Sequence, residues 1–207
     1  MKTDIIFWNV DTQIDFVEPG GKLYVPGAEL LKPLWAKILA FAKKNEIRVV
    51  NTADFHYKGS AELSADPDFI STFPEHCMAD TLGAEYVEET DPVDPLIFDW
   101  NREYFSFDEV LSRKNILIRK DAFDVFAGNP HTEKIVEILA PETVVVFGVT
   151  TNVCVNDAVV GLVHRVKNVY VVENAIKELP NIPLPFKNWE KLGVKLVQSS
   201  ELGDLLV

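Results

Sequence analysis

Cys154 follows the apolar run Thr143–Val149 by only a few residues, and Gly148 permits a tight turn between them. Thr151 or Asn152 could cap a helix that begins at this point, which would place the sulfur in the first helical turn. There the positive end of the helix dipole favours a thiolate, and free backbone N–H groups could stabilise an oxyanion. The alternative is a small buried hydrophobe, the more common role of a lone cysteine.

Two charged residues end other apolar runs and could assist such a nucleophile. Asp11 ends the first run and is either a turn cap or a general base for the thiol, provided that burial raises its pKa. Asp15 is its rival, but Asp11 lies at the strand terminus. Lys120 ends the run Asn115–Arg119 and is either a solvated charge or a partner that keeps Asp11 ionised.

Asp54 and His56 follow a further apolar run, and His76 appears twenty residues after His56. One carboxylate and two imidazoles are a common ligand set for Zn, Fe or Mn, and three protein ligands leave positions open for water or substrate. The alternative is a turn aspartate and two loop histidines. Glu62 could add a carboxylate, whereas Cys77 is expected to pack. We expect the other histidines, His131 and His164, to take no part.

Short apolar runs alternate with longer amphipathic segments, which predicts an α/β fold with three layers: a parallel sheet between helices. The expected strands are Ile5–Asp11, Ile47–Asp54, Asn115–Lys120, Thr143–Val149, Asn168–Asn174 and Val194–Ser199. The expected helices are Ala28–Asn45, Phe107–Lys114, His131–Ala140, Asn152–Val166 and Leu184–Leu192. The stretches 55–101 and 178–185 are rich in proline and read as loops. We predict six parallel strands in the order 3-2-1-4-5-6, with ligands bound beyond their carboxyl ends.

The bulk composition narrows the class of protein. The 207 residues are 47% hydrophobic, which suits a single domain over residues 1–207 with one sizeable core. A formal charge of −12 argues against nucleic acid or an anionic membrane surface as a partner and leaves a small-molecule substrate. Two cysteines, no secretory leader and no apolar run of about 20 residues predict a cytoplasmic protein. A homo-oligomer is compatible with all of this.

Together these residues resemble the isochorismatase-like cysteine hydrolase superfamily, and within it the nicotinamidase branch. The segment Asp11–Phe16, with the Pro-Gly-Gly turn that follows, is similar to the family's opening motif. Residues 54–56 and 73–77 resemble its two metal motifs, with Phe55 in place of tryptophan. Residues 148–155 resemble the nucleophile turn. One departure is Asp121, which stands where nicotinamidases usually have glycine.

The resemblance implies roles for the candidate residues. Asp11, Lys120 and Cys154 would be the catalytic triad, and the N–H groups of Thr150 and Cys154 the oxyanion hole after a cis peptide bond at Val149–Thr150. Asp54, His56 and His76 would bind one divalent transition metal ion.

The implied reaction is hydrolysis of nicotinamide to nicotinate and ammonia through a thioester. The substrate ring would lie against aromatic side chains, for which Phe16, Phe123 and Phe126 are the candidates. One alternative is hydrolysis of another small amide or ureide, of carbamoyl or ureidoacrylate type. Another is a non-catalytic binding protein with the same fold, against which the joint presence of Asp11, Lys120 and Cys154 argues.

Overall fold

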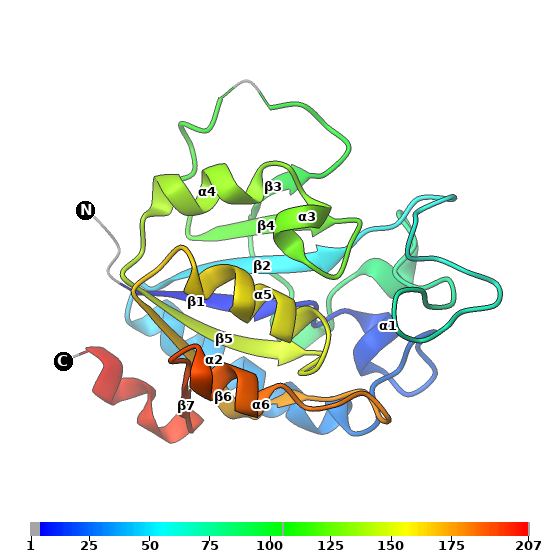
Figure 1. Ribbon diagram of the computed structural model, residues 1–207. Coiled ribbons are helices and arrows are strands. Elements are labelled where there is room, and N and C mark those ends of the chain that lie inside the picture. The colour runs from blue at the N-terminus through cyan, green and yellow to red at the C-terminus, as the bar shows by residue number, and fades with distance from the viewer. Residues whose placement is uncertain (1–4, 105, 207) are drawn as a thin grey trace.

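The centre of the protein is a parallel β-sheet between helices (Figure 1). The structure is a computed structural model that describes residues 5–104 and 106–206. In these residues the sheet has seven strands in the order β3-β4-β2-β1-β5-β6-β7. Their bounds are β1 Ile5–Val10, β2 Arg48–Asp54, β3 Leu96–Asp99, β4 Asn115–Lys120, β5 Thr143–Val149, β6 Asn168–Lys177 and β7 Lys195–Val197.

The α/β class and the order of the six expected strands are confirmed. The prediction of six strands was wrong by one, because β3 adds an edge strand beside β4. This strand has only four residues and lies within a stretch expected to be a loop. An edge strand pairs on one side only, and a run of four residues shows little hydrophobic periodicity.

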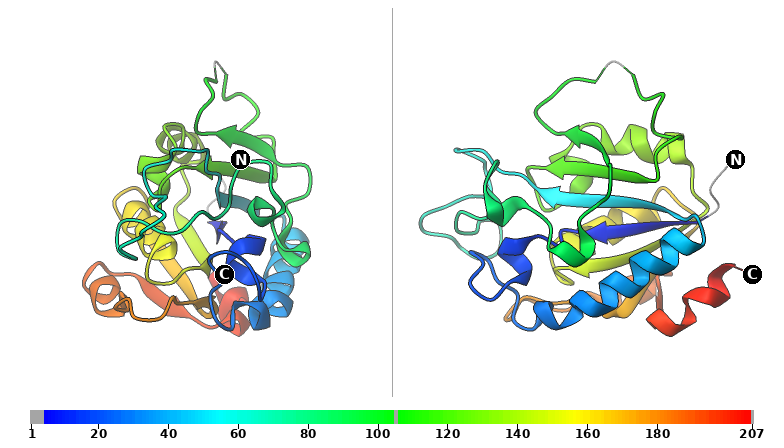
Figure 2. Two further views of the ribbon diagram at one scale, coloured as in Figure 1. Left: turned by 90° about the vertical axis from the view of Figure 1, so that its right-hand side faces the viewer. Right: turned by 180° about the vertical axis from the view of Figure 1, so that it is seen from behind.

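Alternate residues of each central strand face opposite sides of the sheet. In β1, Ile6, Trp8 and Val10 belong to one core cluster, whereas Phe7 belongs to the other. The first cluster is covered by α3 (Val125–Gly128), α4 (Thr132–Leu139), α5 (Cys154–Val163) and α6 (Phe186–Lys191). The second is covered by α2 (Lys32–Lys44) and the 3-10 helix η4 (Ser199–Leu206), which Figure 2 shows from behind. Burial on both faces explains the continuous apolar runs of the sequence.

One expected helix, Phe107–Lys114, is wrong: the segment forms successive turns. The buried guanidinium of Arg48, at the start of β2, donates hydrogen bonds to carbonyl oxygens of this segment. Its Nε donates to the Arg113 carbonyl at 2.7 Å, and its Nη2 donates to the Leu111 carbonyl at 2.7 Å. These contacts join the turn to β2 in place of a regular helical ladder.

The carboxyl ends of the strands meet one edge of the molecule, where the irregular segments collect (Figure 1). The short helix α1 (Ile14–Val17) lies there, after β1, and the loop after β2 extends beyond it. Smaller 3-10 helices complete the chain: η1 Ala28–Leu31, η2 Leu82–Ala84 and η3 Glu88–Thr90. This edge is therefore where side chains from different strands can meet.

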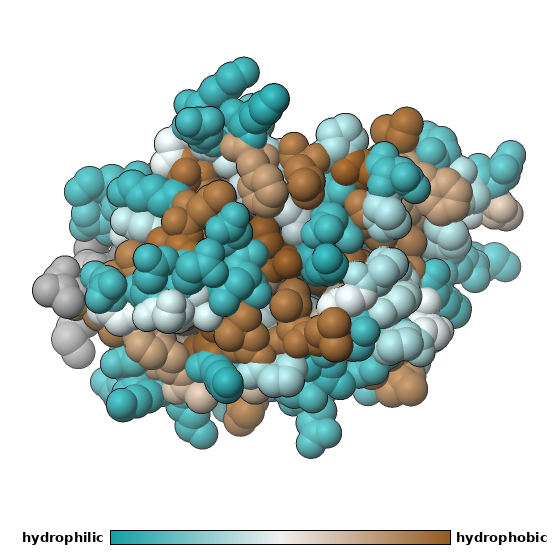
Figure 3. Space-filling model, turned by 90° about the horizontal axis from the view of Figure 1, so that it is seen from below, coloured by the Kyte–Doolittle hydropathy of each residue, from teal (hydrophilic) through white to brown (hydrophobic). Residues whose placement is uncertain are grey.

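The surface seen from below mixes apolar and hydrophilic residues (Figure 3). Leu184 and Leu196, in the segment before α6 and in β7, are among the exposed large apolar side chains. None of the described helices combines the length and the apolar character needed to cross a membrane.

Candidate active site

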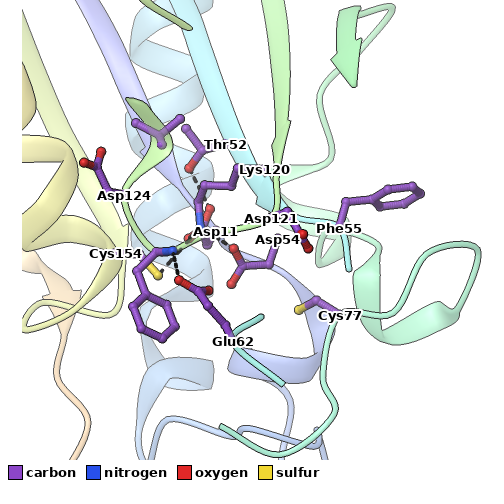
Figure 4. Close-up of polar contacts among 12 residues, drawn as sticks. Asp11, Thr52, Asp54, Phe55, Glu62, Cys77, Lys120, Asp121, Asp124 and Cys154 are labelled. Atoms are coloured by element: carbon purple, nitrogen blue, oxygen red, sulfur yellow. Dashed lines mark hydrogen bonds and ion pairs between the residues drawn. The ribbon is translucent and has the colours of Figure 1, made fainter. Parts of the chain in front are cut away.

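Lys120 is the hub of a buried network at the carboxyl ends of β1, β2 and β4. Its Nζ lies 3.0 Å from Asp11 Oδ2 and forms an ion pair with Asp54 Oδ1. Its distance to Cys154 Sγ is 3.8 Å. Asp54 and Lys120 are register partners on neighbouring strands, so the lysine reaches across β2 to the end of β1. The structure thus brings Asp11, Lys120 and Cys154 together, and Figure 4 shows their side chains turned toward one another.

Burial and the charge of neighbouring groups shift the pKa values of this network in opposite directions. Burial raises the pKa of Asp11, with Lys120 acting against it and Asp54 adding to it. Burial also raises the pKa of the Cys154 thiol well above its usual value, and Lys120 only partly offsets this. Desolvation would lower the pKa of Lys120, but the two carboxylates raise it well above its usual range. In the expected resting state, Cys154 is a thiol, Lys120 is protonated, and the Asp11 carboxylate beside them has a raised basicity.

The turn before Cys154 is shaped by close backbone contacts. Gly148 has a φ of 121°, and a Cβ there would lie 2.1 Å from the Val10 carbonyl oxygen. The peptide bond between Val149 and Thr150 is cis. Cys154 is the first residue of α5, so its N–H has no acceptor within the helix. That N–H is free to serve a substrate oxygen beside the sulfur.

Asp54, His56 and His76 present donor atoms to one another at the end of β2. One ligand atom from each lies within 4.8 Å of the others, and all three residues are buried. Asp54 Oδ2 is 3.9 Å from His56 Nε2 and 3.6 Å from His76 Nε2. The other ring nitrogens are already engaged, His56 Nδ1 with Asp121 Oδ1 at 2.8 Å and His76 Nδ1 with the Pro74 carbonyl at 2.7 Å.

These contacts fit a metal ion. Because a carboxylate and a carbonyl can only accept, each Nδ1 carries a proton, which leaves Nε2 as the nitrogen of each ring that can bind a metal ion. One carboxylate oxygen and two such nitrogens lie close together in a buried space, an arrangement that a cation stabilises. The set of one carboxylate and two imidazoles suits a divalent transition metal.

Other sequence candidates lie apart from this cluster. Glu62 is outside the group of metal-ligating atoms, and its Oε1 accepts the Phe123 N–H at 2.8 Å. Cys77 is buried, and its sulfur contacts the Gly83 carbonyl at 3.7 Å. His131 packs against Phe98 and Tyr104, and His164 is the C-cap of α5. Asp15, the rival of Asp11, accepts the backbone N–H groups of Lys22 and Cys77.

A small cavity lies beside the sulfur, and residues of both centres, Cys154 of the first and Asp54 and His76 of the second, line it. Its walls are largely apolar or aromatic: Phe16, Leu23, Asp54, Phe73, His76, Phe123, Thr150, Val153, Cys154 and Leu179 line it. Phe16 and Phe123, two of the expected substrate contacts, are among them. Phe126 is not, because it stacks on Trp8 and lies under the Arg165 guanidinium. That position gives Phe126 a packing role in α3 in place of the expected substrate contact.

Sequence reasoning missed several of these neighbours. Leu23 and Leu179 enter the cavity from loops, and their sequence neighbourhoods carry no pattern that predicts it. The Thr150 hydroxyl is buried and has no hydrogen-bond partner among the described residues. Asp121 departs from the family pattern, and its place directly after Lys120 at the end of β4 is the signal that it faces the site.

Known proteins resemble this chain in sequence or in structure. Nicotinamidase/pyrazinamidase from Mycobacterium tuberculosis is 40% identical over 77 residues, an alignment that covers 37% of this chain and 40% of the relative. N-carbamoylsarcosine amidase from Thermoplasma acidophilum has a similar structure, with 22% identity, a TM-score of 0.74 and coverage of 98% of this chain and 99% of that one. Pyrazinamidase from Pyrococcus horikoshii, solved in complex with zinc, has 22% identity, a TM-score of 0.70 and coverage of 94% and 99%. At 22% sequence identity, these structural similarities are evidence for the fold alone.

The extent of the family match decides the assignment. Residues 6–182 match the isochorismatase domain, which is most of the chain and includes the strands, the turn and the loop residues that build the site. The chain therefore belongs to the isochorismatase family of hydrolases.

Proposed function

We propose that this protein is a metal-assisted cysteine amidohydrolase that converts nicotinamide and water to nicotinate and ammonia. One observation carries the proposal: the nucleophile candidate Cys154 and two of the three metal-ligand residues, Asp54 and His76, line the same small cavity, whose other walls are mostly apolar. A flat aromatic amide matches this combination, because the ring needs apolar walls while its amide needs a nucleophile and oxyanion donors.

The reaction begins with the thiol. Asp11 accepts the Cys154 proton, and the sulfur attacks the amide carbon while the N–H groups of Thr150 and Cys154 stabilise the oxyanion. Asp11 then returns the proton to the amine, the C–N bond breaks and ammonia leaves a thioester on Cys154. Asp11 next deprotonates a water that attacks the thioester, and the sulfur regains a proton as the acid is released. Lys120, 3.0 Å from Asp11 and 3.8 Å from the sulfur, stabilises both anions in turn.

Asp54, His56 and His76 would hold the metal ion, for which zinc, iron and manganese are the candidates. When bound it supplies a Lewis acid that can hold a ring nitrogen or a water. Phe16 and Phe123 stand on the cavity wall where the ring of such a substrate would lie.

A second candidate is a ureide or carbamoyl amide. The observation that favours it is the Thr150 hydroxyl, which lines the cavity without a hydrogen-bond partner among the described residues. A ureide carries a second polar nitrogen that this hydroxyl could bind, whereas the aromatic ring of nicotinamide would leave it unpaired.

Ammonia release separates the candidates. The purified protein would be tested on nicotinamide, pyrazinamide, ureidoacrylate and an N-carbamoyl amino acid, with its metal content measured in the same preparation. We expect the highest kcat/KM for nicotinamide. Preference for a carbamoyl compound would favour the second candidate, and no turnover of any of the four would favour a binding protein.

A further inference from the structure

His56 is held by a side chain that is not part of either centre. Its Nδ1 contacts Asp121 Oδ1 at 2.8 Å, and its Nε2, which faces Asp54, is buried and has no hydrogen bond to any described residue. Since the Asp121 carboxylate only accepts hydrogen bonds, Nδ1 must be the protonated nitrogen of the ring. The carboxylate therefore selects which nitrogen is free to bind a metal ion.

Asp121 is itself fixed from two directions. Its backbone N–H donates to the Gly128 carbonyl at 3.1 Å, and the Ser60 hydroxyl donates to its Oδ1. The Ser60 hydroxyl in turn accepts the Tyr57 N–H at 3.2 Å, in a turn that Gly59 permits with a φ of 96°. The loop that leaves His56 thus folds back to hold the carboxylate that orients His56.

The two histidines are oriented by different devices. His76 donates from Nδ1 to the Pro74 carbonyl, a backbone group two residues away. His56 depends on a side chain 65 residues away, which arrives beside it only because β2 and β4 are neighbours. Only the second device can be removed by one substitution that leaves the ligands in place.

We propose that Asp121 is a positioning residue for the metal centre: with Ser60 it fixes His56 in its Nδ1–H form and aims Nε2 at the ion. The inference rests on the metal site of the proposed function. Two consecutive residues at the end of β4 then act on different centres: Lys120 contacts the nucleophile centre, and Asp121 orients a ligand of the metal centre. Outer carboxylates of this kind typically change metal affinity by about 10–100-fold when they are removed.

The test is a metal-affinity measurement without substrate. The protein is stripped with a chelator, then titrated with Co²⁺, whose visible absorption reports ligand geometry, and with Zn²⁺ against a competing indicator. Asp121→Leu removes the acceptor, and Asp121→Asn keeps an acceptor oxygen but removes the charge. Asp124→Asn is the matched control, because it removes a charge three residues away, where the side chain caps α3 and an asparagine retains the cap.

We expect Asp121→Leu to weaken Zn²⁺ and Co²⁺ binding by about 10–100-fold and to change the Co²⁺ spectrum. Asp121→Asn should lose less, Ser60→Ala should also weaken binding, and Asp124→Asn should match the wild type. If the leucine variant does not fold, the asparagine and Ser60→Ala variants decide the matter by the same readouts.

Wild-type affinity and an unchanged spectrum in the Asp121 variants would overturn the inference, as would an equal loss in Asp124→Asn. A wild-type protein that binds no metal would overturn it too. A wild-type protein that binds metal but releases no ammonia from nicotinamide would sink the proposed function and leave the role of Asp121 intact.

Discussion

At the scale of single residues, Asp54 joins the two halves of the site. Its Oδ1 pairs with Lys120, while its Oδ2 faces the Nε2 atoms of His56 and His76. Burial would raise the Asp54 pKa, but the charge of Lys120 lowers it well below its usual range, so the carboxylate stays ionised. Asp11 beside it has a raised pKa. Two neighbouring carboxylates thus divide into a fixed anion that suits a metal and a base that can exchange a proton.

The proposed nucleophile is tested by comparing the two cysteines. Cys154→Ala should abolish turnover while leaving the metal content unchanged, because the sulfur is not among the Asp54, His56 and His76 donor atoms. Cys77→Ala should keep turnover, since its sulfur contacts the Gly83 carbonyl and Cys77 is not among the residues that line the cavity. Acid quenching during turnover of a slow amide, followed by peptide mass spectrometry, should find the acyl group on Cys154. An acyl group on Cys77 would show that the nucleophile is misassigned.

Glu62 gives the metal-free protein a predictable dependence on pH. Burial raises the pKa of its carboxyl from 4.5 to about 8. Between these pH values the unfolded chain releases a proton that the folded chain retains. The free energy of unfolding therefore falls as the pH rises from 4.5 toward 8. Glu62→Gln removes this titration and can still accept the Phe123 N–H. Calorimetry from pH 5 to 9 should therefore show the variant gaining in Tm on the wild type as the pH rises, and a constant difference would contradict the assignment.

At the scale of elements, the strands were predictable and the loops were not. Strands covered on both faces must be apolar throughout, so β1, β2, β4 and β5 were readable from composition, and their ends placed Asp11, Asp54 and Lys120 at one edge. The four-residue β3 and the turn held by Arg48 depend on contacts distant in sequence. The same holds for Leu23, Leu179 and the contact of Asp121 with His56.

The end of β5, which leads into the nucleophile turn, should tolerate substitution poorly. In Gly148→Ala, the new Cβ would meet the Val10 carbonyl oxygen at 2.1 Å at a φ of 121°, so both strain and overlap oppose it. We expect a loss of more than about 2 kcal/mol in the free energy of unfolding. Gly203→Ala is the matched control, because among the described residues its Cβ would meet no atom within 4 Å beyond its chain neighbours and the backbone of its own helix. Equal urea midpoints for the two variants would show that the backbone does not approach so closely.

At the scale of the whole molecule, the chain concentrates its chemistry at one edge of the sheet. The triad, the metal ligands and the cavity come from β1, β2, β4, the start of α5 and the loops beyond them, whereas the opposite ends of the strands contribute none of these residues. The net charge of −12 is compatible with the expected small-molecule substrate. A single domain and a homo-oligomer stay predictions, which limited proteolysis and light scattering would test.

The metal site should couple this edge to the stability of the whole fold. An ion that binds only the folded chain, supplied at about 100 times its Kd, stabilises by about 2.7 kcal/mol. For a chain of 207 residues this corresponds to a rise in Tm of about 5–11 °C over the chelator-treated protein. Scanning calorimetry with Zn²⁺ and with Mn²⁺ measures it. His76→Ala removes one ligand without touching Lys120, so its Tm should respond far less to the same ions. An equal response in both proteins would place the bound ion elsewhere, because the Asp54, His56 and His76 group would then contribute nothing to it.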